Sequence, residues 1–119
     1  MRVMIIGASR NPEKFGNKAV RSYKKQGHDV LPVNLEARQI EGILCYHDVS
    51  EPPGPIDRAL LYLPPDLGIH VLEPLAHRGD VADLYVNPGA ESEALLVRAH
   101  QLGLHVVQAC AIMAIGESP

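Results

Sequence analysis

Three stretches of this chain repeat one local order, in which a glycine closes a helix-like segment and an apolar run follows it. The stretches are QGHDVLPVN, RGDVADLYVN and LGLHVVQA, and their apolar runs lie at residues 29–33, 81–86 and 104–108. A helix, a glycine and then a strand is the order found in βαβ units. The repeat therefore predicts parallel strands with helices packed on the faces of the sheet.

Further segments extend this pattern. Strands are expected at residues 2–6 and 59–63, with a weak one at 43–46, because these are short apolar runs stopped by glycine, proline or polar residues. Helical spacing of apolar residues predicts helices at 17–26, 66–78 and 91–102. Gly68 and Pro74 should kink the second of these helices or delay its start.

Length and composition limit how these elements are organised. A chain of 119 residues with 46% apolar residues suits one compact core. The expected fold is α/β, a single domain over residues 1–119 with a doubly wound, mainly parallel sheet of five or six strands. Ligands of such sheets lie at the carboxyl ends of the strands. Four loops should therefore converge on one crevice: Gly7-Ala8-Ser9, Val33-Asn34, Leu63-Pro64-Pro65 and Asn87-Pro88-Gly89.

Charge is distributed unevenly along the chain. Residues 1–27 contain seven basic residues and one acid, whereas the remaining 92 contain four basic and thirteen acidic residues. An anionic ligand is therefore expected near the N-terminal segment. Nucleic-acid binding is disfavoured, because the chain has one Phe, no Trp and an acidic remainder. Without an apolar run long enough for a membrane span, or a secretion signal, we expect no membrane association and a cytoplasmic protein.

The loop after the first strand has the residues of a phosphate site. Gly7 allows a sharp turn, Ala8 keeps the turn small, and Ser9 adds a hydroxyl donor. The helix that follows offers free N–H groups and the positive end of its dipole. Asn17 can cap this helix or reach the ligand. Three basic residues surround the loop: Arg10, Lys14 and Lys18. Each residue also has an ordinary structural reading as turn glycine, cap or solvated helix face.

The glycine spacing argues against the common dinucleotide fingerprint GxGxxG. Gly7 and Gly16 are nine residues apart, and the second strand ends in Val33-Asn34 with no acid; the nearest, Glu36, comes two residues later. An adenine nucleotide with an extra ribose phosphate would instead favour nearby basic residues, such as Arg38, Lys14 or Arg10.

At family level, the chain resembles the small stand-alone CoA-binding proteins of bacteria and archaea. The resemblance rests on GASRNPEKFGNKAVRSYKKQGHDVLPVN, CYHDVSEPPGPID, LPP, NPGAESEALLVRAHQLGLHVV and a late Cys110, and it extends from Val3 to about Ala111. It implies a Rossmann-like domain, similar to the CoA-binding domain of the succinyl-CoA synthetase α subunit, with coenzyme A as the ligand. The family often has serine at the position of Gly16 and glutamine at that of Asn87.

The resemblance also assigns contacts. It implies that Gly7, Ala8 and Ser9 meet the pyrophosphate, Asn17 the phosphate region, and Val33 and Asn34 the adenosine side. Leu63, Pro64 and Pro65 would meet the adenine or the pantetheine arm. With the basic residues and the glycine of the first loop, the candidate binding residues are Gly7, Ala8, Ser9, Arg10, Lys14, Gly16, Asn17, Val33, Asn34, Leu63, Pro64 and Pro65.

No catalytic motif accompanies these binding residues. The six histidines and two cysteines, Cys45 and Cys110, lie outside any nucleophile-elbow, Walker or HExxH pattern. His70 and His77 could share one helix face, but their spacing is a weak metal signal and no third ligand accompanies them. Binding of CoA or an acyl-CoA is therefore favoured over catalysis. Two alternatives stay open: an NAD(P)-binding oxidoreductase or redox module, and an interaction subunit with a vestigial nucleotide site that forms a homo-oligomer or joins an unknown partner enzyme.

Overall fold

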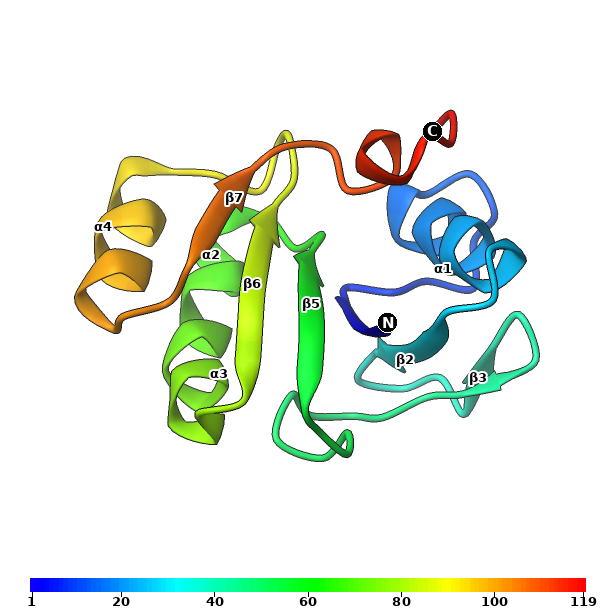
Figure 1. The fold of residues 1–119 in the computed structure, drawn as a ribbon, viewed down its shortest axis with the longest axis horizontal. Coiled ribbons are helices and arrows are strands. Elements are labelled where there is room, and N and C mark those ends of the chain that lie inside the picture. Colours follow the sequence, from blue (N-terminus) through cyan, green and yellow to red (C-terminus); the bar gives the residue numbers. More distant parts are fainter.

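Five parallel strands form the central sheet of the computed structural model, which describes residues 1–119. Their order across the sheet is β2-β1-β5-β6-β7, so β1 lies beside the central strand β5 (Figure 1). The chain reverses direction across the sheet between β1 and β5, which is the switch point where doubly wound folds bind ligands. The strands span Arg2–Ile6 (β1), Asp29–Val33 (β2), Ile56–Leu61 (β5), Val81–Val86 (β6) and Val106–Gln108 (β7).

Helices cover both faces of this sheet, as expected for a doubly wound fold. One face packs against α3 and α4, and the other packs against α1 and the C-terminal segment (Figure 1). The helical segments are α1 (Phe15–Lys25), α2 (Pro65–Gly68), α3 (Leu72–Arg78) and α4 (Glu93–Gln101), with 3₁₀ turns η1 (Ile69–Val71) and η2 (Met113–Ile115). The predicted α/β single domain with a parallel sheet is therefore the observed architecture.

Strand β1 shows why a continuous apolar run belongs at the switch point. Val3 and Ile5 point toward α1, whereas Met4 and Ile6 point toward α3 and α4. All four side chains are 2% exposed or less. Successive side chains of a strand alternate between faces, so a strand covered on both sides favours apolar residues at successive positions.

The C-terminal segment crosses back from β7 to α1 and is held there by hydrogen bonds. The Tyr23 hydroxyl donates to the carbonyl of Ala111 at 2.6 Å, and Gln26 Nε2 donates to the carbonyl of Ile115 at 2.8 Å. Tyr23 is fully buried. Burial raises the pKa of its phenol, partly opposed by the hydrogen bond from Arg58. This segment covers part of the sheet face that α1 leaves open.

The boundaries of β5 differ from the predicted strand at 59–63. The strand starts earlier, at Ile56, and ends at Leu61. The charged residue Arg58 interrupts the apolar pattern in the first half of β5, so the sequence did not predict a strand there. In the structure, its guanidinium stacks over the Tyr85 ring at 4.4 Å and donates to the Tyr23 hydroxyl at 3.1 Å. A long basic side chain is tolerated in this strand because these two aromatic partners accept it.

The weak strand expected at 43–46 belongs to a separate hairpin. Gln39–Ile40 (β3) and Ile43–Leu44 (β4) pair antiparallel, and Tyr46 makes only a single bridge to Val33 of β2. Glu41 and Gly42 form the turn with positive φ angles of 52° and 76°. The main sheet therefore has five strands, and the hairpin serves as the connection from β2 to β5.

The interruption predicted between Gly68 and Pro74 is confirmed. Helix α2 ends at Gly68, a 3₁₀ turn follows, and α3 begins at Leu72. Pro74 has no N–H to donate to the preceding turn, so a continuous α-helix would lose a hydrogen bond there. A Cβ on Gly68 would lie 3.2 Å from Leu61 and 3.3 Å from Leu95, which shows how closely α2 approaches the sheet.

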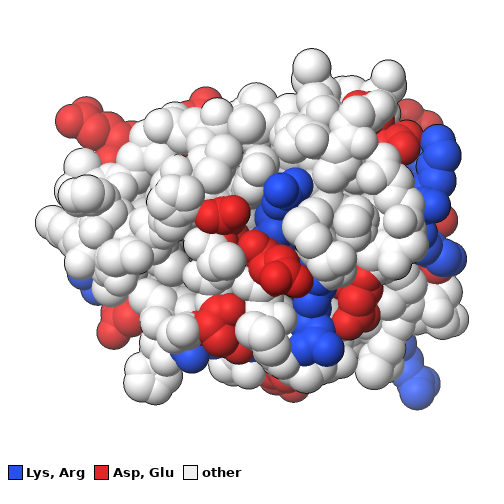
Figure 2. All heavy atoms as spheres, in the orientation of Figure 1, with Lys and Arg blue, Asp and Glu red and all other residues white.

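Surface charge follows the uneven distribution seen in the sequence. Figure 2 shows basic side chains along the side where α1 lies in Figure 1, and mixed acidic and basic side chains over the centre of this face. None of the helices is long and apolar enough to cross a membrane.

Candidate functional site

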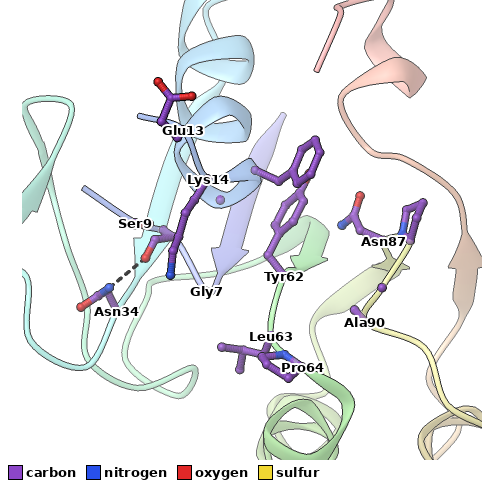
Figure 3. A pocket seen from close by; sticks show the side chains of 15 residues that line it. Gly7, Ser9, Glu13, Lys14, Asn34, Tyr62, Leu63, Pro64, Asn87 and Ala90 are labelled. Carbon is purple, nitrogen blue, oxygen red and sulfur yellow. Dashed lines mark hydrogen bonds between the residues drawn. The ribbon is translucent and has the colours of Figure 1, made fainter. Parts of the chain in front are cut away.

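A cleft of about 640 Å³ lies at the carboxyl ends of the strands. The loops after β1, β2, β5 and β6 all contribute to it, so the four predicted loops do converge. Figure 3 shows Gly7, Ser9 and Lys14 on one side, Tyr62 in the middle, and Asn87 and Ala90 on the other side. The lining residues are Gly7, Ala8, Ser9, Glu13, Lys14, Phe15, Gly16, Asn34, Tyr62, Leu63, Pro64, Asn87, Pro88, Gly89 and Ala90.

The floor of the cleft depends on two glycines in close contact. Gly7 turns the chain out of β1 with φ of 88°, a conformation that favours glycine, and a Cβ there would lie 3.0 Å from the Tyr62 carbonyl. A Cβ on Gly16 would lie only 2.2 Å from the carbonyl oxygen of Gly7. Glycine at 16 therefore lets the first turn of α1 pack directly on the loop.

Two asparagines hold the loop after β1 in place. Asn17 is fully buried, and its Nδ2 donates to the carbonyl of Ser9 at 2.9 Å and to Glu41 Oε2 at 3.2 Å. Its Oδ1 accepts from Arg21 Nε at 2.8 Å. Asn34 Nδ2 donates to the carbonyl of Ala8 at 2.8 Å, drawn as the dashed line in Figure 3. Both side chains are thus used within the protein to shape the loop.

Several backbone N–H groups of the cleft have no acceptor within the protein. Those of Ala8, Ser9, Phe15 and Gly16 make no hydrogen bond to backbone or side chain. Helix α1 also lacks a side-chain cap and has no acid in its first turn. Unpaired N–H groups at a helix N-terminus, beside a glycine turn, form the usual seat of a phosphate.

The charged side chains of the cleft are Lys14 and Glu13, which lie beside the N-terminus of α1. In Figure 3, Lys14 extends past Ser9 on the same wall, whereas Glu13 points away from both. The Ser9 hydroxyl accepts a hydrogen bond from the Asn11 N–H at 3.0 Å, which stabilises the turn and leaves its proton free to donate. This wall therefore offers a cation, a hydroxyl and free N–H groups to an anion.

The opposite wall carries no charge. It consists of Tyr62, Leu63 and Pro64 after β5 and of residues 87–90 after β6. Asn87 is 2% exposed; its Nδ2 donates to the carbonyl of Leu61 at 3.1 Å, and its Oδ1 accepts from the Ala111 N–H at 2.8 Å. The Tyr62 hydroxyl is buried without a partner, and burial raises the pKa of this phenol.

A second hollow of about 620 Å³ lies beside the first loop, on the β2 side of the molecule. All six of its lining residues are polar or glycine: Arg10, Glu36, Arg38, Gln39, Glu41 and Gly42. Arg10 directly follows Ser9, and Glu36 lies two residues after Asn34, so the two hollows meet at the loop ends of β1 and β2. This hollow contains the guanidinium groups of Arg10 and Arg38 and the carboxylate of Glu36, while the Glu41 carboxylate accepts a hydrogen bond from Asn17.

Eight of the twelve predicted residues line the cleft: Gly7, Ala8, Ser9, Lys14, Gly16, Asn34, Leu63 and Pro64. Four lie elsewhere. Arg10 belongs to the second hollow, and Pro65 begins α2 beyond the lining. Val33 is buried in β2, where its carbonyl accepts from the Gly7 N–H at 3.3 Å. Asn17 is buried beneath the loop, so its side chain shapes the site from below.

Glu13, Phe15, Tyr62 and residues 87–90 also line the cleft, although they are not among the predicted binding residues. The loop at 87–89 was recognised as a strand end, yet no contact was assigned to it. The strand predicted at 59–63 includes Tyr62, but β5 ends at Leu61, so Tyr62 belongs to the loop that lines the cleft. A strand end at Leu61 is the signal that places Tyr62 in this loop.

The histidines, cysteines and aspartates of the chain lie outside the lining of the cleft. Cys45 is buried, and burial raises the pKa of its thiol; Cys110 is partly buried, and both are free thiols. No three His, Cys, Asp or Glu side chains lie close enough together to hold a metal ion. The arrangement is suited to holding an anionic ligand by backbone and side-chain donors.

Comparison with known families gives this arrangement a context. Residues 1–116 match a family model described as a CoA binding domain. The α subunit of acetate–CoA ligase (ADP-forming) II from Pyrococcus furiosus is 27% identical over 115 residues, which is 88% of this chain and 25% of the ligase subunit. An acetate–CoA ligase (ADP-forming) from Methanocaldococcus jannaschii is 30% identical over 73% of this chain and 12% of the ligase. The chain thus spans a quarter or less of the length of these curated relatives.

Solved structures share the fold over nearly the whole chain. A conserved hypothetical protein from Pyrococcus furiosus is 32% identical with a TM-score of 0.86, covering 95% of this chain and 97% of that one. An acetyl-coenzyme A synthetase from Ca. Korarchaeum cryptofilum, described in complex with phosphate and ADP, is 29% identical with a TM-score of 0.78. That match covers 92% of this chain and 25% of the synthetase.

Proposed function

This chain belongs to the family of CoA-binding domains, and from that premise we propose that its cleft binds coenzyme A or an acyl-CoA. The diphosphate lies against the free N–H groups of Ala8, Ser9, Phe15 and Gly16, with Lys14 supplying a positive charge. These unpaired donors at the start of α1 are the observation that carries the proposal. The ADP-forming acetate–CoA ligases that the chain resembles are named for chemistry with the same cofactor.

The orientation of the ligand follows from the two hollows. The adenosine end extends toward β2, where Asn34 leads to the hollow of Arg10 and Arg38. The pantetheine arm then runs the other way, along the uncharged ends of β5 and β6. Charged groups of the ligand thus meet donors and cations, and its neutral arm meets neutral walls.

Binding without catalysis is the function we assign to this domain. Ser9, Glu13 and Lys14 are the cleft side chains with a nucleophile or base character; Figure 3 shows Glu13 pointing away from Ser9, and we assign Lys14 to the charge of the diphosphate. A serine becomes a nucleophile through an adjacent base. The role of Ser9 is therefore to donate to the phosphate.

An acid placed in the phosphate seat tests the assignment. We expect Ser9→Glu to abolish CoA binding measured by calorimetry, because its carboxylate would face the diphosphate. Ser9→Ala should lower the affinity by about tenfold or less, because only one hydroxyl donor is lost. His70→Ala, an exposed change on η1, is the control and should bind as the wild type does. Full CoA binding by Ser9→Glu would refute this seat.

A thermal-shift panel with CoA, acetyl-CoA, NAD and NADP separates the proposal from the NAD(P) alternative. A ligand that binds only the folded protein raises its melting temperature. We expect a shift with the CoA compounds, and a shift with NADP alone would replace CoA binding with a dinucleotide function.

The hollow of Arg10 and Arg38 is expected to select for the 3′-phosphate of CoA. Charge-assisted hydrogen bonds from guanidinium groups favour a phosphate dianion. We expect the wild type to bind CoA about tenfold more tightly than dephospho-CoA. Arg38→Gln or Arg10→Gln should reduce this difference in affinity between the two ligands. Lys25→Gln, at the far end of α1 in an ion pair with Glu117, is the matched charge control. Equal affinity of the wild type for both ligands would rule out a phosphate contact here.

A further inference from the structure

Glu36 carries a carboxylate for which the protein supplies no partner. The residue is exposed and lines the second hollow together with Arg10 and Arg38. Its side chain nevertheless makes no hydrogen bond and no ion pair with either guanidinium group; only its backbone N–H is bonded. An ionised carboxylate accepts hydrogen bonds and donates none. Its oxygens are therefore free for a ligand group that donates a hydrogen bond.

The backbone of Glu36 is fixed relative to the first loop by Asn34. The Asn34 Oδ1 accepts from the N–H groups of Glu36 and Ala37, both at 2.9 Å, while its Nδ2 donates to the carbonyl of Ala8 at 2.8 Å. Asn34 itself lines the cleft, at the end away from Asn87 in Figure 3. This turn therefore holds Glu36 where the cleft meets the second hollow.

The other acceptors of this hollow are less suited to a ligand donor. The Glu41 carboxylate already accepts from Asn17 Nδ2 at 3.2 Å, and the Gln39 amide is uncharged. A hydrogen bond to an ionised acceptor is about twice as strong as one between neutral groups. Glu36 is thus the charged acceptor of the hollow that no protein group occupies.

We propose that Glu36 determines ligand specificity by accepting a hydrogen bond from the 2′-hydroxyl of the CoA ribose. This inference rests on the proposed function, which directs the 3′-phosphate to Arg10 and Arg38. The 2′-hydroxyl is on the ribose carbon next to that phosphate, so the same hollow receives both groups. An acid beyond the second strand holds a ribose hydroxyl in dinucleotide-binding folds. A phosphate on the 2′ carbon, as in NADP, would instead meet the like charge of Glu36.

A ligand that lacks only this hydroxyl tests the inference. Calorimetry on the full chain should compare CoA with 2′-deoxy-CoA. One hydrogen bond to a charged group should make the wild type bind CoA about tenfold more tightly. In Glu36→Ala the two ligands should bind within about twofold of one another, whereas Glu36→Gln should keep about threefold, because its amide oxygen still accepts a weaker hydrogen bond.

The ratio of the two affinities is the readout because Glu36→Ala also removes a negative charge near the 3′-phosphate, which affects both ligands alike. Glu93→Ala removes an exposed carboxylate from the first turn of α4 and should keep the wild-type ratio. Melting curves of each variant verify folding. A ratio near one in the wild type would overturn the inference, and so would a tenfold ratio that survives in Glu36→Ala.

The outcomes also separate this inference from the proposed function. Wild-type protein that binds neither ligand would refute both. Wild-type protein that binds the two ligands equally would refute the contact with Glu36 and leave CoA binding intact. Equal affinity for CoA and dephospho-CoA would overturn the inference as well, because the ribose would then not lie in this hollow.

Discussion

Gly16→Ala is expected to destabilise the protein by about 3 kcal/mol or more and to abolish CoA binding. The added Cβ would lie 2.2 Å from the Gly7 carbonyl oxygen and 3.2 Å from the Ala8 Cα. Overpacking typically costs about 1–3 kcal/mol, and backbone atoms yield less readily than the end of a flexible side chain. Helix α1 must therefore move away from the loop, which separates the two sets of N–H groups in the phosphate seat.

Urea unfolding and calorimetry with CoA measure the two effects of Gly16→Ala. Ser22→Ala, a partly exposed position further along the same helix, is the control and should change neither. A Gly16→Ala protein of wild-type stability would show that α1 does not pack on the Gly7 turn as described. Gly16→Ser adds a Cβ at the same place, and the same contact predicts that this variant fails too.

Asn17→Ala is expected to lower the free energy of unfolding by about 3 kcal/mol. It removes the donor to the Ser9 carbonyl and to Glu41, and the acceptor for Arg21. A buried polar group left without a partner costs about 1–3 kcal/mol. CoA affinity should also fall by at least about tenfold, because the Ser9 carbonyl loses the Asn17 hydrogen bond that holds the loop in position.

The substitution Asn17→Asp distinguishes hydrogen bonding from shape. It keeps the size of the side chain but sets a carboxylate against the Ser9 carbonyl and the Glu41 carboxylate, so at neutral pH it should be worse than Asn17→Ala. Gln101→Ala removes an exposed amide at the end of α4 and is the control for both variants. Denaturant unfolding at pH 7 measures all three. An Asn17→Asp protein as stable as the wild type would contradict this hydrogen-bond network.

The residues around the first loop show which site features are readable from sequence. The turn at Gly7, the small residue Ala8 and the donor Ser9 were predicted as an anion seat, and the free N–H groups of Ala8 and Ser9 lie in the cleft lining. Such a seat is local, since it depends on consecutive backbone groups. Asn17 was expected to cap α1 or reach the ligand, and instead it is buried between the loop and the β3–β4 hairpin. That role depends on Glu41, 24 residues away, and so could not be predicted from local pattern.

By itself, the sequence determined the order of strands and helices, the parallel sheet and the loops that meet at its edge. Runs of apolar residues ended by glycine or proline specify these features through backbone geometry and side-chain periodicity, which act within a few residues. Only the tertiary structure decided that Gly16 packs on Gly7, that Tyr62 leaves β5 to enter the cleft, and that Phe15 stays exposed beside it. Those features arise from contacts between segments that are distant in the sequence. Close packing there decides which side chains are buried and which stay exposed, and local sequence preferences do not distinguish these outcomes.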